Sequence, residues 1–293
     1  MNQRRKYSLS IILTINLICC IGNLSFVKNA DNVLKEARKQ YYKIKNCSME
    51  ESVITEYSDQ LKETKKEAKL FVDEELLYAK FRSFEKQKLN SLEEFYFYSE
   101  NNNIIFVLND NKLWNKILDA QKKNYYYYSA SSLSSYYDII NNVDDVSKIE
   151  EIPYKKQRVF KIQGTLTNAM TRRWLLFEGF GSALEKLDYS SEYISKHFEN
   201  LGYAKFVLYV DTTNFYPVEY SVDLTKPRNK MVDKSLDLVD GSIHHLADSI
   251  IRDLSEIRNA KGYVFNCNFS KVNSTGKFTV PKEVKSAKVK AIN

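Results

Sequence analysis

Short stretches in which apolar and polar residues alternate fill residues 48–114, and this pattern limits the fold more than any other part of the chain. Alternation with a period of two is typical of a β-strand that places one face on a core. Polar turns such as residues 100–103 and 109–112 separate the stretches, which predicts an antiparallel meander. The alternating residues are Val53, Thr55 and Tyr57, then Leu70 and Val72, then Leu77, Ala79 and Phe81, then Phe95 and Phe97 with Tyr96 and Tyr98 on the other face, then Ile105 and Val107.

Apolar residues at spacings of three and four predict helices around this meander. Residues 122–151 are interpreted as a loop and a helix that crosses the sheet. The other expected helices cover residues 30–44, 191–200 and 242–258, and further strands are expected at 159–167, 203–211, 218–224 and 263–269. Only 8 Gly and 4 Pro are present, and no Gly-rich or Pro-rich linker divides the chain, so residues 23–293 are predicted to form a single domain.

The N-terminus has the pattern of an export signal. Arg4, Arg5 and Lys6 precede an uncharged apolar stretch, residues 7–27, and residues 1–22 are assigned as the signal. Leu17-Ile18-Cys19-Cys20 is similar to the motif at which a lipoprotein is cut and lipidated, here on Cys20. Cleavage before Asn23 would instead release a secreted protein, and an uncleaved stretch of about 20 apolar residues would span a membrane. All three alternatives place the chain outside the cytoplasm, at the outer face of the cell membrane or in the medium.

The net charge of +7 comes largely from the two ends of the chain. The three basic residues at positions 4–6 supply part of it, and a basic tail from about residue 282 supplies most of the rest. The body between them is close to neutral, which argues against a nucleic-acid partner.

Cysteine and catalytic patterns point away from metals and enzymes. Of the four cysteines, Cys47 and Cys267 follow the signal and allow one disulfide, although the lack of a motif around them slightly favours two small buried thiols instead. Gly179-Phe180-Gly181-Ser182 is not a hydrolase nucleophile elbow, and His244 and His245 point about 100° apart on a helix. We therefore predict no catalytic residue, no metal and no cofactor, and a protein that is not an enzyme.

Several short motifs follow an export signal that ends at a cysteine and a leading helix: Phe95-Tyr96-Phe97-Tyr98, Ile104-Ile105-Phe106-Val107, Lys112-Leu113-Trp114, Val207-Leu208-Tyr209-Val210-Asp211, Pro217-Val218-Glu219-Tyr220 and Val280-Pro281-Lys282-Glu283-Val284. Taken in this order, they resemble the LolA/LolB-like lipoprotein-carrier superfold, in particular lipoproteins of low-GC Gram-positive bacteria that share it. The resemblance implies an α+β fold with a single curved antiparallel β-sheet, a half-barrel, and helices on its concave side. It also implies an apolar cavity that holds acyl chains.

Two functions therefore remain open. In the first, inward aromatic side chains form an apolar groove for a lipid or similar amphiphile, which would be bound non-catalytically. In the second, the protein is a surface module that binds protein or cell-wall polymer through exposed tyrosines, with residues 125–128 as the patch. The residues expected to line the groove are Tyr96, Tyr98, Phe106, Trp114 and Tyr209.

Overall fold

The computed structural model describes residues 29–58, 60–85, 88–100, 103–110, 113–117, 132–175, 190–240, 258 and 260–289. The export signal with Cys20, the tyrosine run 125–128, His244 and His245 lie outside these residues, as does nearly all of the helix expected at 242–258. No helix in the described ranges is long and apolar enough to cross a membrane.

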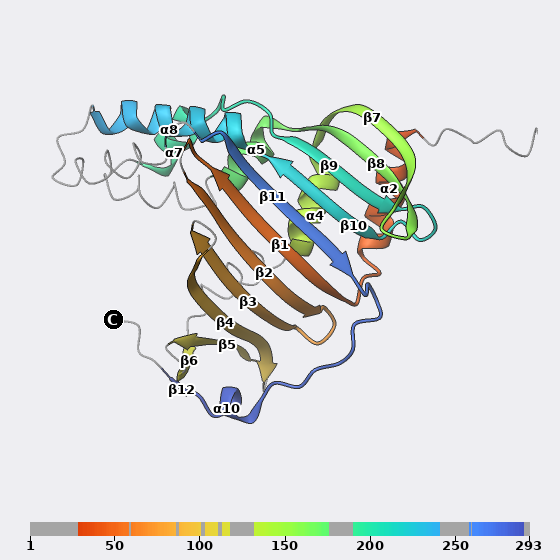
Figure 1. Cartoon of the computed structure of the whole chain (residues 1–293), viewed down its shortest axis with the longest axis vertical. Coiled ribbons are helices and arrows are strands. Elements are labelled where there is room, and N and C mark those ends of the chain that lie inside the picture. Colours follow the sequence, from red (N-terminus) through yellow and green to blue (C-terminus); the bar gives the residue numbers. More distant parts are fainter. Residues whose placement is uncertain are drawn as a thin grey trace, which may run out of the picture.

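One sheet of 12 strands organises the described residues, in the order β12-β6-β5-β4-β3-β2-β1-β11-β10-β9-β8-β7. Neighbouring strands are antiparallel except β12 and β6, which pair in parallel through two residues. The α+β class and the single curved, unclosed sheet agree with the prediction, and Figure 1 shows the strands fanning across the front of the molecule. The strands are β1 (Asn46–Glu56), β2 (Leu61–Phe71), β3 (Leu76–Glu85), β4 (Lys88–Glu100), β5 (Asn103–Asp110), β6 (Leu113–Ile117), β7 (Val143–Tyr154), β8 (Gln157–Leu166), β9 (Lys205–Asp211), β10 (Pro217–Asp223), β11 (Gly262–Ser270) and β12 (Lys288–Val289).

Helices cover one face of this sheet, here called the inner face. α2 (Ala30–Tyr41) and α4 (Ser132–Asn141) bury apolar residues in the main core, and the Nε of Arg38 on α2 donates to the carbonyl oxygen of Ile140 on α4 at 2.7 Å. α5 (Asn168–Leu175) buries Met170 and Leu175 in the same core. α7 (Ser191–His197) and α8 (Thr225–Asp240) lie at the end of the sheet where β11 begins (Figure 1). α10 (Lys282–Lys285) belongs to the C-terminal segment.

The end of α4 corrects one sequence expectation. The helix predicted through Val143 ends at Asn141, and Val143 instead begins β7, which is an edge strand. Two bulges interrupt its pairing with β8, and a side chain at Gly164 would collide with the backbone oxygen of Asp145. Bulges break the alternation of apolar and polar residues by which a strand is recognised, so β7 was not predicted from the sequence.

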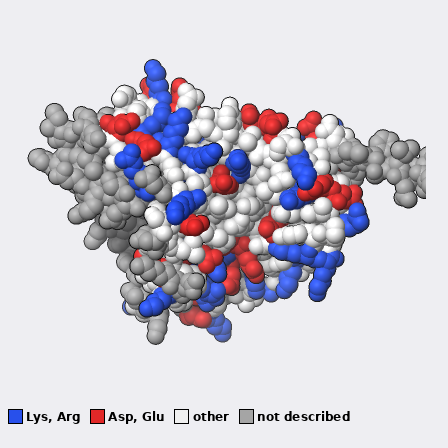
Figure 2. All heavy atoms as spheres, turned by 45° about the horizontal axis from the view of Figure 1, so that its top comes forward, with Lys and Arg blue, Asp and Glu red and all other residues white. Residues whose placement is uncertain are grey.

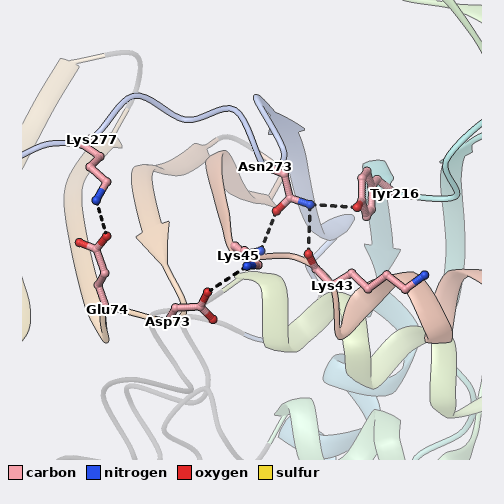
Figure 3. A network of polar contacts seen from close by, with 7 residues as sticks. All are labelled: Lys43, Lys45, Asp73, Glu74, Tyr216, Asn273 and Lys277. Carbon is pink, nitrogen blue, oxygen red and sulfur yellow. Dashed lines mark hydrogen bonds and ion pairs between the residues drawn. The ribbon is translucent and has the colours of Figure 1, made fainter.

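The C-terminal segment, residues 271–289, runs around the lower edge of the sheet in Figure 1 and packs Phe278 on the face opposite to the helices, here called the outer face. It leaves β11, passes the β2–β3 turn and brings β12 beside β6 (Figure 1). Its first turn is fastened by Asn273, whose Nδ2 donates to the carbonyl oxygen of Lys43 at 3.1 Å and to the Tyr216 hydroxyl at 2.9 Å. The Lys45 backbone N–H donates to the Oδ1 of the same side chain at 2.7 Å (Figure 3). Asn273 therefore joins β11, the start of β1 and the β9–β10 turn.

Charged side chains of both signs are spread over the surface rather than separated. Figure 2 shows Lys and Arg intermixed with Asp and Glu on the face that it presents. Pairs such as Arg82 with Glu67 and Arg158 with Glu151 join neighbouring strands. This mixture leaves no broad field of one sign on that face.

Candidate functional site

The inner face is packed unevenly from one edge of the sheet to the other. Over β8 to β10, the inward residues Ile162, Leu208 and Val222 are all fully buried. Over β3 to β5, Phe81, Phe106 and Leu108 face the same side but remain only partly buried. Apolar side chains that the fold leaves partly accessible on a concave face are the candidate contacts for a hydrophobic ligand.

Three phenyl rings form a continuous row on this part of the inner face. Phe81 stacks on Phe95 with ring centroids 5.5 Å apart and planes 24° apart, and Phe95 contacts Phe106 at 5.3 Å. Phe95 is 7% exposed and forms the centre of the row. We call Phe81, Phe95 and Phe106 the phenyl row. Its rings come from β3, β4 and β5 because inward positions of adjacent antiparallel strands lie side by side.

A buried ion pair borders the phenyl row. Lys66 Nζ lies 2.9 Å from Glu51 Oε1, and the two side chains are 3% and 15% exposed. The Ser132 hydroxyl, at the first residue of α4, donates to Glu51 Oε2 at 2.6 Å. The Lys66 ammonium also lies 5.8 Å from the centroid of the Phe81 ring. The pair therefore fixes the start of α4 against β1 and β2, next to the accessible rings.

This pair was missed from the sequence, although the sequence contains a signal for it. Glu51 follows Met49 by two residues and Lys66 precedes Ala68 by two, so both charges occupy inward positions of the alternation. Charged residues at inward positions are rare unless they are paired.

Buried polar groups continue across β10 and β11 on the inner face. Burial raises the pKa of the Cys267 thiol well above its usual range, and nearby Glu51 raises that pKa further. Burial likewise raises the pKa of the Tyr220 hydroxyl. Trp174 on α5 lies over this region, with ring centroids 5.6 Å from Phe265 and 6.4 Å from Tyr220. Its indole therefore reports on the inner face.

The five residues predicted to line one groove are divided between the two faces. Phe106 is in the phenyl row, whereas Tyr96, Tyr98 and Trp114 lie on the outer face in a second apolar cluster. Tyr209 lies on the outer face of β9 and stacks on Tyr154 at 4.4 Å. Alternate residues of a strand point to opposite faces, so these five do not form a single groove.

The second cluster is already covered by the C-terminal segment. The Phe278 ring lies 5.5 Å from Phe71, 6.1 Å from Tyr78 and 6.3 Å from Tyr96. Val284 is fully buried against the same residues. We call Phe71, Tyr78, Tyr96, Tyr98, Trp114 and Phe278 the outer aromatic cluster. It packs within the chain, so the phenyl row is the stronger candidate for contact with a ligand.

Cys47 and Cys267 are both free and buried, so they do not form the disulfide that the sequence allowed. The register places Cys267 opposite Glu51, four residues along β1 from Cys47. At a strand rise of about 3.3 Å per residue, this offset separates the two Cα atoms by more than the roughly 7 Å that a disulfide tolerates. Within the described residues, no group of three His, Cys, Asp or Glu is arranged to hold a metal ion.

No protein-family model matches the chain, and no curated protein matches it. Solved structures with a similar chain path include LprF from Mycobacterium bovis, at 12% identity and a TM-score of 0.47, covering 87% of this chain and 96% of that one. The lipoprotein LppX from Mycobacterium tuberculosis has 10% identity and a TM-score of 0.42, covering 85% and 99%. A putative outer membrane lipoprotein-sorting protein domain from Vibrio parahaemolyticus has 11% identity and a TM-score of 0.27, covering 83% and 92%. TM-scores below 0.5 do not establish a shared function, so the role of the site is inferred from its own residues.

Proposed function

We propose that this protein binds the acyl chain of a lipid or similar amphiphile on the inner face over β3 to β5, without converting it. One observation carries the proposal. Phe81, Phe106 and Leu108 face the helix-covered side of the sheet, yet they are only partly buried there. An acyl chain laid on these side chains would remove apolar surface from water on both partners.

The buried ion pair supports the same reading by its position. Lys66 and Glu51 already neutralise each other, so this pair offers no unpaired charge to a ligand beside the phenyl row. The apolar portion of a ligand is therefore the portion expected to contact the phenyl row. A charged headgroup would stay near water.

The test is binding of fatty acids by fluorescence. In a Trp114→Phe variant, Trp174 is the remaining tryptophan and lies over the inner face. We expect its emission to change on titration with fatty acids, and native mass spectrometry of protein prepared without detergent to show bound lipid. Phe81→Ala and Leu108→Ala should each weaken binding about tenfold or more.

Leu92→Ala is the matched control, because Leu92 is 52% exposed and lies on the outer face of β4. The Leu92→Ala variant should bind fatty acids with the same affinity as the parent protein. Protein that is empty as isolated and that binds no added fatty acid in native mass spectrometry would refute the proposal.

We also propose that the chain is exported and tethered to the membrane through a lipid on Cys20. Arg4, Arg5 and Lys6 before an uncharged apolar stretch support export, and Leu17 three residues before Cys20 supports lipidation. Cys20→Ser should release the protein from membranes into the medium. Retention of the variant in membranes would favour an uncleaved anchor, and an unmodified Met1 in the cytosol would refute export.

A further inference from the structure

An open hollow of about 540 Å³ lies on the outer face, where three turns meet. The β7–β8 turn contributes Lys155 and Gln157, the β9–β10 turn contributes Asp211 and Asn214, and the end of β11 contributes residues 268–272 and 274. Its volume is within the range of small-molecule sites. The hollow is separate from the phenyl row, which faces the other side of the sheet.

The turns around this hollow keep an unfavourable backbone conformation. The angle φ is positive at Lys155 (46°), Lys156 (71°), Phe215 (58°), Lys271 (53°) and Asn273 (57°), and none of these residues is glycine. Such residues are uncommon, and they persist only where neighbouring contacts hold them in place. The five come from three turns that are far apart in sequence and converge on one site.

Side-chain contacts hold these turns in place. The Lys155 ammonium donates to Glu219 Oε2 at 2.6 Å and to the Oδ1 of Asn268, which ties the β7–β8 turn to β10 and β11. The Tyr154 hydroxyl donates to the same Glu219 oxygen at 2.6 Å. Asn273 fastens the turn after β11, as Figure 3 shows. The walls of the hollow are therefore set before any ligand arrives, which lowers the entropic cost of binding.

The chemistry of the walls is polar without a net charge. Two carboxylates, Glu50 and Asp211, and two ammonium groups, Lys155 and Lys271, line the hollow, and the Lys155 ammonium is already paired with Glu219. Because Lys155 is already paired, the walls offer an anion no excess of positive charge. Side-chain amides and hydroxyls supply both donors and acceptors, and the half-buried Tyr216 adds a small apolar wall. The polar groups are Gln157, Asn214, Asn268, Ser270 and Ser274.

We propose that this outer hollow binds a neutral sugar unit of a glycan. A sugar presents hydroxyl groups that need donors and acceptors around a ring, and its C–H face fits an apolar wall. Asn268 is the central residue, because Lys155 fixes its Oδ1 and thereby orients its Nδ2 protons. The protein would then hold an amphiphile on the inner face and a saccharide on the outer face.

The experiment is calorimetric titration of the full chain with neutral trisaccharides: cellotriose, maltotriose and chitotriose. Glycerol 3-phosphate and phosphocholine serve as charged and zwitterionic probes. We expect at least one trisaccharide to bind, with neither ionic probe binding more tightly. Asn268→Ala and Gln157→Ala should each weaken that binding about tenfold or more.

Asn266→Ala and Gln163→Ala are the matched controls. Asn266 lies two residues along β11 from Asn268 on the same face, and Gln163 lies on the same face of β8 as Gln157, but neither lines the hollow. Both variants should bind as the wild type does, and thermal unfolding of all four should show that they fold. The proposal is overturned if no trisaccharide binds, if an ionic probe binds more tightly, or if Asn266→Ala weakens binding as much as Asn268→Ala does.

Discussion

Glu51 and Lys66 face each other across β1 and β2 on the inner side of the sheet, with 2.9 Å between carboxylate oxygen and ammonium nitrogen. The Ser132 hydroxyl completes the site from α4. The pair thus joins the meander to the helix that covers it, beside the phenyl row. A charged pair in this position is a constraint on the fold, because neither charge can lose its partner without remaining buried alone.

Removing one member of this pair should therefore be costly. Lys66→Met is expected to lower the free energy of unfolding by about 3–5 kcal/mol, because Glu51 would stay buried without its counter-charge. Lys66→Met combined with Glu51→Leu should recover most of that loss. Urea unfolding followed by circular dichroism measures both.

Lys65→Met is the control for this measurement. Lys65 pairs with Glu63 at 3.1 Å, but its side chain is 49% exposed. Its loss should cost about 1 kcal/mol or less. Equal losses for Lys65→Met and Lys66→Met would show that the buried pair has no special role.

Ligand affinity should depend on the length of the acyl chain. Each methylene group that the phenyl row removes from water contributes about 0.8 kcal/mol, which is roughly a fourfold change in affinity. Trp174 emission in the Trp114→Phe variant, titrated with fatty acids of increasing length, measures this series. Affinity that does not change with chain length would place the binding energy in the headgroup instead.

The sequence predicted strands better than it predicted which face each side chain would use. Phe95, Tyr96, Phe97 and Tyr98 were correctly assigned to a strand, because their alternation is local. Both faces of this strand are apolar, however, and only contact with Phe278 shows that Tyr96 lies beneath the C-terminal segment. No pattern within the meander contains that contact, which joins residues far apart in the chain.

Two helices were missed for local reasons. α8 has Pro227 within its first turn, where proline is tolerated but reads as a turn signal. Its start is marked by Asp223, whose Oδ1 accepts from the Thr225 backbone N–H at 2.9 Å. α5 is only eight residues long, too short for a clear helical period. The Asn273 contacts could not be predicted at all, because they depend on three turns meeting in space.

Phe278 is the residue through which the C-terminal segment covers the rest of the outer aromatic cluster. Phe278→Ala should lower the free energy of unfolding by about 1–3 kcal/mol, less than for a fully buried phenylalanine. In a Trp174→Phe background, Trp114 emission should move to longer wavelength as water reaches the cluster. Lys277→Ala is the control, because it removes only an exposed ion pair with Glu74 at 3.1 Å. Unchanged Trp114 emission in Phe278→Ala would mean that the segment does not shield the cluster.

The two buried thiols should make the protein less stable in alkali. Burial raises the pKa of Cys47 to about 12 and that of Cys267 well above its usual range. An unfolded thiol ionises near pH 8.5, so above that pH the unfolded state has lost a proton that the folded state keeps. Each buried thiol therefore makes its full contribution to the free energy of unfolding below about pH 8.5. This contribution is lost as the pH rises toward the pKa that the thiol has in the folded protein. Each thiol should lower the free energy of unfolding by up to about 1.4 kcal/mol per pH unit in this window.

Cys47→Ala separates this effect from other titrations. Urea unfolding measures the free energy of unfolding at about pH 7.5 and at about pH 10. This free energy should fall less between the two pH values for the variant than for the wild type. Any packing energy that the substitution costs at both pH values cancels in this comparison. Mass mapping after iodoacetamide at about pH 8 should find Cys47 and Cys267 unmodified in the folded protein and alkylated in urea, because only an accessible thiolate reacts. Rapid alkylation of either thiol in the folded state, or equal pH dependence for variant and wild type, would show that these cysteines are not shielded by the sheet.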